Sequence, residues 1–169
     1  MQAISEDKFT GDINANIAII HKICNVYFVG DHDRQDARQE ILYQLWKSYP
    51  SYKGDAKFST WMYKVALNTA IIYLKKRKRH QSKDLLPGQM EHIAESNEQA
   101  GPDEKMRILY TAINTLSEID KAITLLYLEN NSYEEISSIT GITKSNVSVR
   151  LVRIRRALKE KLKNIISTF

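Results

Sequence analysis

The segment from Ser132 to Leu158 restricts the fold of this chain more than any other part of the sequence. Ser132 and Glu135 have the spacing of a capping box, in which each side chain bonds the backbone N–H of the other residue at a helix start. Gly141 can adopt the left-handed conformation that ends a helix, and Thr143 can cap the next one. The segment therefore predicts two helices joined by a tight turn.

Apolar residues at helical spacing indicate how these two helices pack. Ile136 and Ile139 face a core from the first helix, and Ile142 closes the turn. Successive residues lie 100° apart on a helix, so the second helix has a narrow apolar arc and an opposite face. The arc consists of Val147, Leu151, Ile154 and Leu158. The opposite face consists of Ser145, Ser148, Val149, Val152 and Arg156, with Arg153 and Arg155 at its margins.

The two valines on this otherwise polar and basic face suggest a partner. In a DNA major groove, valine can pack on thymine methyl groups while Ser and Arg bond base edges. Lys144 and Arg150 would then hold phosphates and set the register. We therefore predict a duplex-reading helix-turn-helix. The alternative is a solvated basic helix that completes a three-helix module for protein interaction.

The rest of the chain also favours helices. It has few prolines and glycines and no sustained alternation of β-branched residues, while its 43% hydrophobic content suffices for a core. We expect a helix from Ile13 to Val29, a charged turn from Asp31 to Arg34, and a second helix that stops before Pro50. A loop over 51–57 leads to a third helix, capped by Ser59 or Thr60. The predicted fold class is all-α.

Charge divides the chain into blocks. The net charge is +5, with six basic residues in 75–83 and eight in 144–163, whereas 84–104 holds six acidic residues and no Lys or Arg. The stretch 80–102 is polar, contains two Pro-Gly pairings and lacks periodicity, so we interpret it as a linker. The predicted domains are 1–80 and 105–169, with a linker over 81–104.

Several classes of protein are disfavoured. Cys24 is the single cysteine, so no intrachain disulfide is possible, and no apolar run has the length of a signal or membrane-spanning segment. His21 and Cys24 lack a second pair with ligand spacing, so we expect structural roles, no metal and no cofactor. Neither a zincin motif nor a glycine-rich phosphate loop occurs, so we expect no enzyme. The sequence suggests a soluble protein of a reducing compartment.

Aromatic residues gather in the first domain. Eight of the fifteen lie between Tyr43 and Tyr73, beside a basic run. Such a mixture can stack unpaired bases and neutralise their backbone, which favours binding of single-stranded nucleic acid. Alternatively, Trp46, Trp61 and Tyr73 fill a small helical core.

Two segments resemble known regions of one family. The run Asp36-Ala37-Arg38-Gln39-Glu40 and the stretch from Tyr52 to Ala70, YKGDAKFSTWMYKVALNTA, are similar to region two of extracytoplasmic-function (ECF) sigma factors of the sigma-70 family. The segment from Leu116 through Tyr133-Glu134-Glu135-Ile136 and the helix-turn-helix resemble region four. The order is correct and most of the chain is covered, although Ser137 stands where many relatives have alanine.

The resemblance implies two small helical domains, sigma-2 with three or four helices and sigma-4, that locate and open promoters with core RNA polymerase. Within sigma-4, Ser148, Val149, Val152 and Arg153 match contacts to the minus-thirty-five element. Asn68 matches a position that helps hold a flipped base of the minus-ten element. The full minus-thirty-five set is Lys144, Ser145, Ser148, Val149, Arg150, Val152, Arg153 and Arg156. The full minus-ten set is Lys57, Phe58, Ser59, Thr60, Trp61, Lys64, Asn68, Thr69 and Tyr73.

The resemblance also implies partners. Asp36, Gln39, Glu40 and Gln44 would dock on the clamp coiled coil of one large polymerase subunit, and sigma-4 on the flap of the other. The acidic linker would follow the transcript path, unless it is a solvated tether. An anti-sigma factor would control the protein in the cytoplasm without membrane insertion. The alternative is a stand-alone helix-turn-helix regulator, which leaves the Asp36 to Ala70 pattern unexplained.

Overall fold

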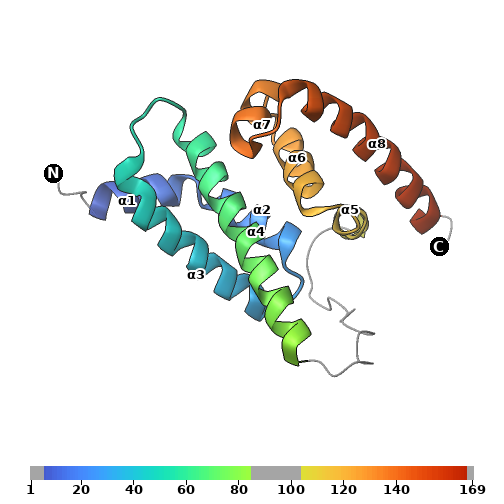
Figure 1. The fold of residues 1–169 in the computed structure, drawn as a ribbon, viewed down its shortest axis with the longest axis horizontal. Coiled ribbons are helices and arrows are strands. Elements are labelled where there is room, and N and C mark those ends of the chain that lie inside the picture. Colours follow the sequence, from blue (N-terminus) through green and yellow to red (C-terminus); the bar gives the residue numbers. More distant parts are fainter. Residues whose placement is uncertain (1–5, 85–103, 167–169) are drawn as a thin grey trace. The chain divides into compact units, whose positions relative to one another are not determined.

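A computed structural model describes residues 6–84 and 104–166 of the chain (Figure 1). Within these two ranges every regular element is a helix, which confirms the predicted all-α class. The chain divides into two compact units, Met1–Gln99 and Ala100–Phe169.

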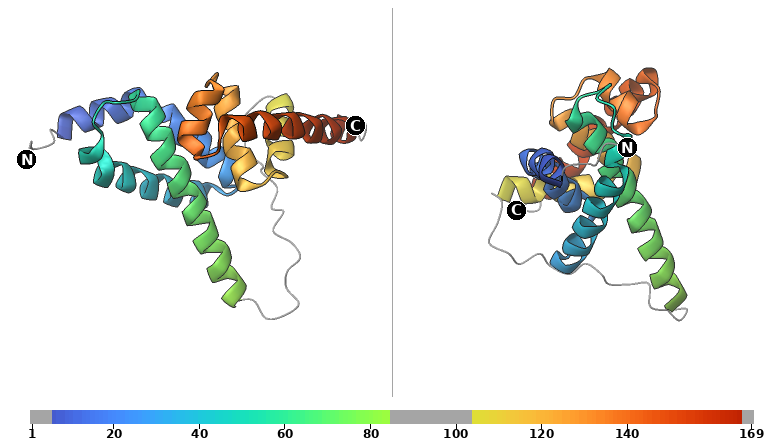
Figure 2. Two further views of the ribbon diagram at one scale, coloured as in Figure 1. Left: turned by 45° about the horizontal axis from the view of Figure 1, so that its top comes forward. Right: turned by 90° about the vertical axis from the view of Figure 1, so that its left-hand side faces the viewer.

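Unit 1 is built around the longest of its helices. Its elements are α1 (Glu6–Ala15), α2 (Ile17–Tyr27), α3 (Asp31–Ser48), the short 3₁₀ helix η1 (Tyr49–Ser51) and α4 (Phe58–Asp84). Helix α4 packs against both α2 and α3, and its C-terminal part extends beyond them (Figure 2). Apolar side chains from these three helices make the core. Its fully buried members include Ile20, Ile23, Ile41, Leu45, Met62 and Ala66.

The predicted single helix from Ile13 to Val29 is wrong, because the helix is interrupted at Asn16. The backbone of Asn16 has φ −121° and ψ 13°, outside the helical range. The side-chain Nδ2 of Asn16 donates a 2.9 Å hydrogen bond to the carbonyl of Asp12. Asn competes for backbone hydrogen bonds in this way, which interrupts a helix even where the apolar spacing continues. Unit 1 therefore has four α-helices in its described part.

Two further boundaries differ from the prediction. The predicted turn from Asp31 to Arg34 is the first turn of α3, where Asp31 and Asp33 lie at the positive end of the helix dipole. Helix α4 begins at Phe58, with the carbonyl of Lys57 accepting from Trp61 N at 3.2 Å, so neither Ser59 nor Thr60 is the cap. Apolar periodicity alone locates helix ends poorly.

The predicted extended linker begins too early. Helix α4 continues through His80 to Asp84, because most residues from Lys75 onward have high helix propensity and none is Pro or Gly. The remaining residues of the predicted linker up to 103 lie outside the described residues, and Glu104 already begins the next helix.

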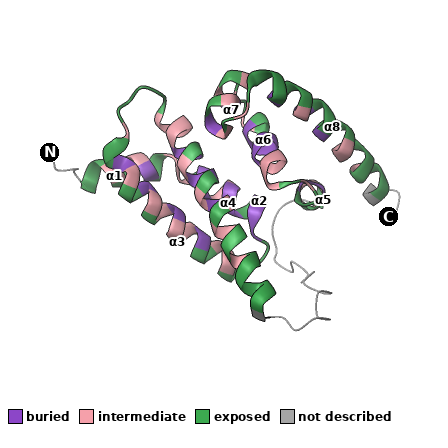
Figure 3. Ribbon diagram, viewed as in Figure 1, coloured by how far each residue is buried: buried purple, intermediate pink, exposed green. Residues whose placement is uncertain are grey.

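Unit 2 contains α5 (Glu104–Asn114), α6 (Glu118–Leu128), α7 (Tyr133–Thr140) and α8 (Lys144–Ile166). Helix α8 packs on the other three, and burial on α8 is confined to the side that faces them (Figure 3). Met106, which the periodicity of α5 places in the core stripe, is 45% exposed in the first turn of this helix. The core is formed by apolar side chains of all four helices. Its members are Ala112, Ile113, Ala122, Ile123, Leu125, Leu126, Ile136, Ile139, Val147, Leu151 and Ile154.

The predicted capping signals of unit 2 are confirmed. Ser132 Oγ accepts from Glu135 N at 3.2 Å while Ser132 N donates to Glu135 Oε2 at 2.8 Å, a complete capping box. Gly141 ends α7 at φ 74°, and Thr143 Oγ1 accepts from Asn146 N at 3.3 Å at the start of α8. Each signal is local in sequence, so the turn is set by residues within it.

None of the helices within residues 6–84 and 104–166 has both the length and the hydropathy of a membrane-spanning segment. The same residues contain no group of three or more His, Cys, Asp or Glu side chains arranged to hold a metal ion. Cys24 is fully buried in the core of unit 1, in agreement with its expected structural role.

Candidate nucleic-acid interface

The outward face of α8 matches the face derived from the sequence. Val147, Leu151 and Ile154 are buried, whereas Val149 and Val152 are 49% and 54% exposed. Ser145, Ser148, Arg153 and Arg156 are also exposed on this helix. Unit 2 therefore presents two valines among polar and basic side chains, on a helix fixed from behind by three others.

Two cations of this helix are held by acidic residues of neighbouring helices. Lys144 Nζ forms an ion pair with Glu134 of α7, and this hydrogen bond lowers the pKa of the Glu134 carboxyl. Arg150 Nη1 lies 2.8 Å from Asp120 Oδ1 of α6. No ion pair within the described residues holds Arg153 or Arg156, so these two guanidinium groups are available to an anion.

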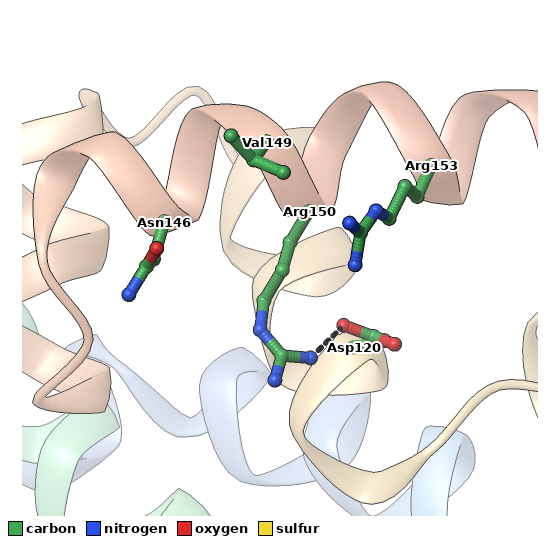
Figure 4. A pocket seen from close by; sticks show the side chains of 5 residues that line it. All are labelled: Asp120, Asn146, Val149, Arg150 and Arg153. Carbon is green, nitrogen blue, oxygen red and sulfur yellow. Dashed lines mark hydrogen bonds and ion pairs between the residues drawn. The ribbon is translucent and has the colours of Figure 1, made fainter.

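The outward face formed by Ser145, Ser148, Val149, Val152, Arg153 and Arg156 is called the reading face, after the duplex contact predicted for it. A pocket of about 310 Å³ lies beside this face. Asn146, Val149, Arg150 and Arg153 line it from α8, and Asp120 lines it from α6 (Figure 4). Arg150 and Arg153 both extend toward the first turn of α6, where Asp120 forms an ion pair with Arg150. The pocket thus combines amide, guanidinium and carboxylate groups at the edge of the predicted duplex contact.

Arg155, on the same helix, contacts Tyr127 of α6. Its guanidinium carbon lies 4.9 Å from the ring centroid of Tyr127, and its Nη2 donates to the Tyr127 hydroxyl at 2.5 Å. A guanidinium above an aromatic ring is attracted by the ring quadrupole. This contact attaches α8 to the end of α6 and removes Arg155 from the reading face.

Unit 1 gathers its aromatic residues around the loop between η1 and α4. The rings of Phe58 and Trp61 are 5.4 Å apart, and Tyr52 lies 5.5 and 5.3 Å from them. Tyr49 joins this cluster from the buried side, 6.2 Å from Trp61. Phe58 and Trp61 remain half-buried, so each keeps some exposed surface while the cluster contacts its ring.

The proposal that Trp46, Trp61 and Tyr73 fill the core is not what the structure shows. Trp46 is 39% exposed, and Trp61 and Tyr73 are half-buried. The buried side chains in this part of unit 1 include Tyr49, Met62 and Tyr63. Burial nevertheless raises the pKa of Tyr73, whose ring meets the edge of Phe28 at 5.9 Å.

A groove of about 470 Å³ runs between α3 and α4. It brings Glu40 and Gln44, predicted to bind polymerase, beside Asn68, Thr69 and Tyr73, predicted to bind the minus-ten element. Gln44 Nε2 donates to Glu40 Oε1 at 2.9 Å and orients both side chains along the groove. The remaining lining residues are Ser48, Val65, Ile72 and Lys76.

The other predicted residues are accessible from solvent. Asp36, Gln39, Lys57 and Lys64 are exposed, but none of them lines the groove. Ser59 and Thr60 are half-buried in the first turn of α4. Thr69, which lines the groove, is half-buried further along the same helix.

Sequence reasoning missed residues that tertiary packing brings to these sites. In unit 2 they are Asp120 and Asn146, and in unit 1 they are Tyr52, Ile72 and Lys76. A helical wheel for α4 places Ile72 one turn from Asn68, and this spacing was the available signal for the groove. No local signal pairs Asp120 with a residue 30 positions away.

Comparison with known proteins identifies the class. Residues 13–80 match the family described as Sigma-70 region 2, and residues 106–158 match Sigma-70, region 4. The two matched segments lie one in each unit and contain the groove and the reading face described above. The chain is therefore a transcription initiation factor of the sigma-70 type.

Full-length relatives narrow this class. The ECF RNA polymerase sigma-E factors of Escherichia coli (strain K12) and Salmonella typhimurium (strain LT2) are each 30% identical, over 98% of this chain and 95% of theirs. That of Haemophilus influenzae is 29% identical, over 98% of this chain and 96% of its own. The chain belongs to the ECF RNA polymerase sigma factors, which direct core RNA polymerase to promoters. The resemblance stated from the sequence is confirmed.

The fold has a solved counterpart. The sigma factor RpoE from Bartonella quintana, determined in complex with the anti-sigma factor NepR, superposes with a TM-score of 0.74. The match covers 92% of this chain and 97% of that one at 21% sequence identity, so it is a likeness of fold.

Proposed function

We propose that unit 2 acts as a sigma-4 domain whose helix α8 reads the minus-thirty-five element in the major groove. The observation that carries this proposal is the pair of exposed valines, Val149 and Val152, between Ser148 and Arg153 on a helix supported from behind. Arg153, Arg156 and Ser145 extend the contact along the same face. Lys144 and Arg150 hold phosphates at its two edges, each already oriented by an acidic neighbour.

Unit 1 acts as a sigma-2 domain that captures the opened minus-ten strand. The partly exposed edges of Phe58 and Trp61 offer stacking surfaces, and Lys57 and Lys64 supply charge for the strand backbone. Asn68 lies in the groove between α3 and α4, where it can bond a base turned out of the duplex. Ser59, Thr60, Thr69 and Tyr73 complete this surface.

Core polymerase binds beside the captured strand. Asp36, Gln39, Glu40 and Gln44 form one side of α3 and meet the clamp coiled coil, while unit 2 meets the flap. Glu40 and Gln44 share the groove with Asn68 and Thr69, so docking and strand capture act on adjacent walls of one groove. Catalysis belongs to the polymerase, and the protein works in the cytoplasm where transcription takes place.

An anti-sigma factor controls this protein. The structurally similar RpoE of Bartonella quintana was solved in such a complex. The acidic stretch between α4 and α5 serves as the linker along the transcript path. Its negative charge resembles that of RNA, which suits a path otherwise used by RNA.

Run-off transcription with core polymerase and a randomised promoter pool tests the proposal. The purified chain should give transcripts that start downstream of a shared upstream sequence and a shared minus-ten sequence. Core polymerase alone should give no enrichment. The proposal fails if the chain produces no specific initiation, or if it binds duplex DNA with equal preference in the absence of polymerase, as a stand-alone regulator would.

A further inference from the structure

Asp120 lies outside every set of residues proposed above, yet it contacts the reading helix directly. It occupies the first turn of α6, and its carboxylate Oδ1 is 2.8 Å from Arg150 Nη1 of α8. The side chains of Arg150 and Asp120 are 39% and 25% exposed, so the pair borders solvent (Figure 4). The contact joins two helices through residues that are 30 positions apart in the chain.

A carboxylate at this position calls for a physical reason. It lines the same pocket as Arg150, Arg153 and Asn146, beside Val149 on the reading face. An acidic group near a DNA backbone weakens phosphate binding unless it acts through a neighbour. Here the neighbour is an arginine, whose long side chain loses considerable rotamer freedom whenever it is fixed by a ligand.

The pairing leaves Arg150 able to bind an anion. A guanidinium group has five N–H donors in a planar fork, and the bond to Asp120 uses one nitrogen, Nη1. The remaining N–H donors can bind an anion, and the bond to Asp120 already fixes the position of their guanidinium group. A phosphate that enters the pocket therefore meets a pre-oriented Arg150, while a phosphate elsewhere along α8 does not.

We propose that Asp120 is a positioning residue that sets the duplex specificity of this protein by holding Arg150 at the pocket. When α8 lies in the correct register, one backbone phosphate enters the pocket and Arg150 binds it. In any other register, Arg150 stays with Asp120 and adds little to the affinity. The inference rests on the proposed function, because it requires that α8 reads the upstream element.

Two promoters that differ only in the upstream element test this role. One carries the element selected by the wild-type holoenzyme, and the other carries a scrambled element, so the minus-ten contacts are the same. The affinity of the holoenzyme for each is measured as a function of salt. The variants are Asp120→Asn, Arg150→Gln, the double variant, and the control Glu118→Gln, which removes an acid from the same turn of α6 outside the pocket.

Asp120→Asn frees Arg150 to follow any phosphate. It should tighten binding to the scrambled promoter by about three- to tenfold and steepen its log–log salt slope by about 0.9, the value for one further phosphate contact. Binding to the selected promoter should change less than about twofold, so discrimination falls. The double variant should lose the gain on the scrambled promoter, and Glu118→Gln should behave as wild type.

The outcomes separate the inference from the function. Equal changes on both promoters with unchanged salt slopes would mean that Asp120 only stabilises α6, and an equal effect of Glu118→Gln would mean that net charge alone acts. Either result overturns the inference while a wild-type preference for the selected element upholds the function. A wild-type holoenzyme without that preference overturns the proposed function and the inference together.

Discussion

The phenol of Tyr49 donates a 2.7 Å hydrogen bond to Oδ2 of Asp12 and so joins α1 to η1, the element that leads into the aromatic loop. Phe9 of α1 adds edge contacts to Tyr49 at 5.1 Å and to Trp46 at 5.0 Å. Burial raises the pKa of Tyr49 to about 12, and the hydrogen bond and charge of Asp12 act in the same direction. Helix α1 thus holds the inner edge of the cluster that carries Trp61.

Replacing Tyr49 by Phe should lower the free energy of unfolding by about 1 kcal/mol at neutral pH, through loss of this hydrogen bond. The same change should also make the unfolding free energy less dependent on pH at alkaline pH. Below pH 10 the phenol is protonated in both states; between 10 and about 12 the unfolded phenol ionises while the native one does not, so stability falls as pH rises. Urea unfolding at several pH values measures both effects.

A matched control is Tyr43→Phe, because Tyr43 is 56% exposed. It should change neither the neutral stability nor the alkaline slope. If Tyr49→Phe leaves the slope as steep as in the wild type, the Asp12 contact does not act in solution as the structure indicates.

Gly141 should not tolerate a side chain, for a backbone reason. A Cβ there meets nothing within 4 Å, but φ is +74°, where an L-residue costs about 1–2 kcal/mol. Gly141→Ala should lower the unfolding free energy by that amount. Gly11→Ala provides the contrast, because Gly11 lies within α1 and a Cβ there also meets nothing within 4 Å. This change should raise the unfolding free energy by about 0.5–1 kcal/mol. Thermal unfolding of both variants compares the two signs; equal effects would exclude backbone strain at Gly141.

The helix-turn-helix of unit 2 could be predicted from the sequence element by element, because its signals are local. Ser132, Glu135, Gly141 and Thr143 act on backbone groups within four residues of themselves. In unit 1 the apolar spacing runs through Asn16 without a break, so the end of α1 depends on a side-chain bond to Asp12 that competes with the helix. Local patterns therefore succeed where the terminating residue is itself distinctive.

The candidate sites divide in the same way. A single helix determines the reading face of α8, so a wheel was enough to find Val149 and Val152. The groove and the pocket each need two helices, and the pairing of Asp120 with Arg150 depends on how α6 crosses α8. Such pairings follow from packing, which the sequence pattern does not specify at the level of side chains.

Cys24 should resist alkylation in the native protein. It is fully buried, and burial raises the pKa of its thiol from 9.0 to about 11, against the smaller opposing effects of Arg38 and Arg34. The thiolate is the reactive form, so this pKa alone slows the reaction about 100-fold at neutral pH. Iodoacetamide labelling followed by mass spectrometry should show slow modification that becomes fast in denaturant. Labelling at the denatured rate without denaturant would contradict the buried position.

Replacing Val149 by Asp should abolish recognition of the upstream element without unfolding the protein. An aspartate on the reading face removes an apolar contact with the groove and brings a negative charge to the phosphates, so promoter affinity of the holoenzyme should fall about 10- to 100-fold. Because Val149 is 49% exposed, the unfolding free energy should change by less than about 0.5 kcal/mol. Met106→Asp is the control, since Met106 is 45% exposed on α5 and belongs neither to the reading face nor to the pocket beside it. Equal losses of promoter binding in the two variants, with both still folded, would show that α8 has no special part in reading the duplex.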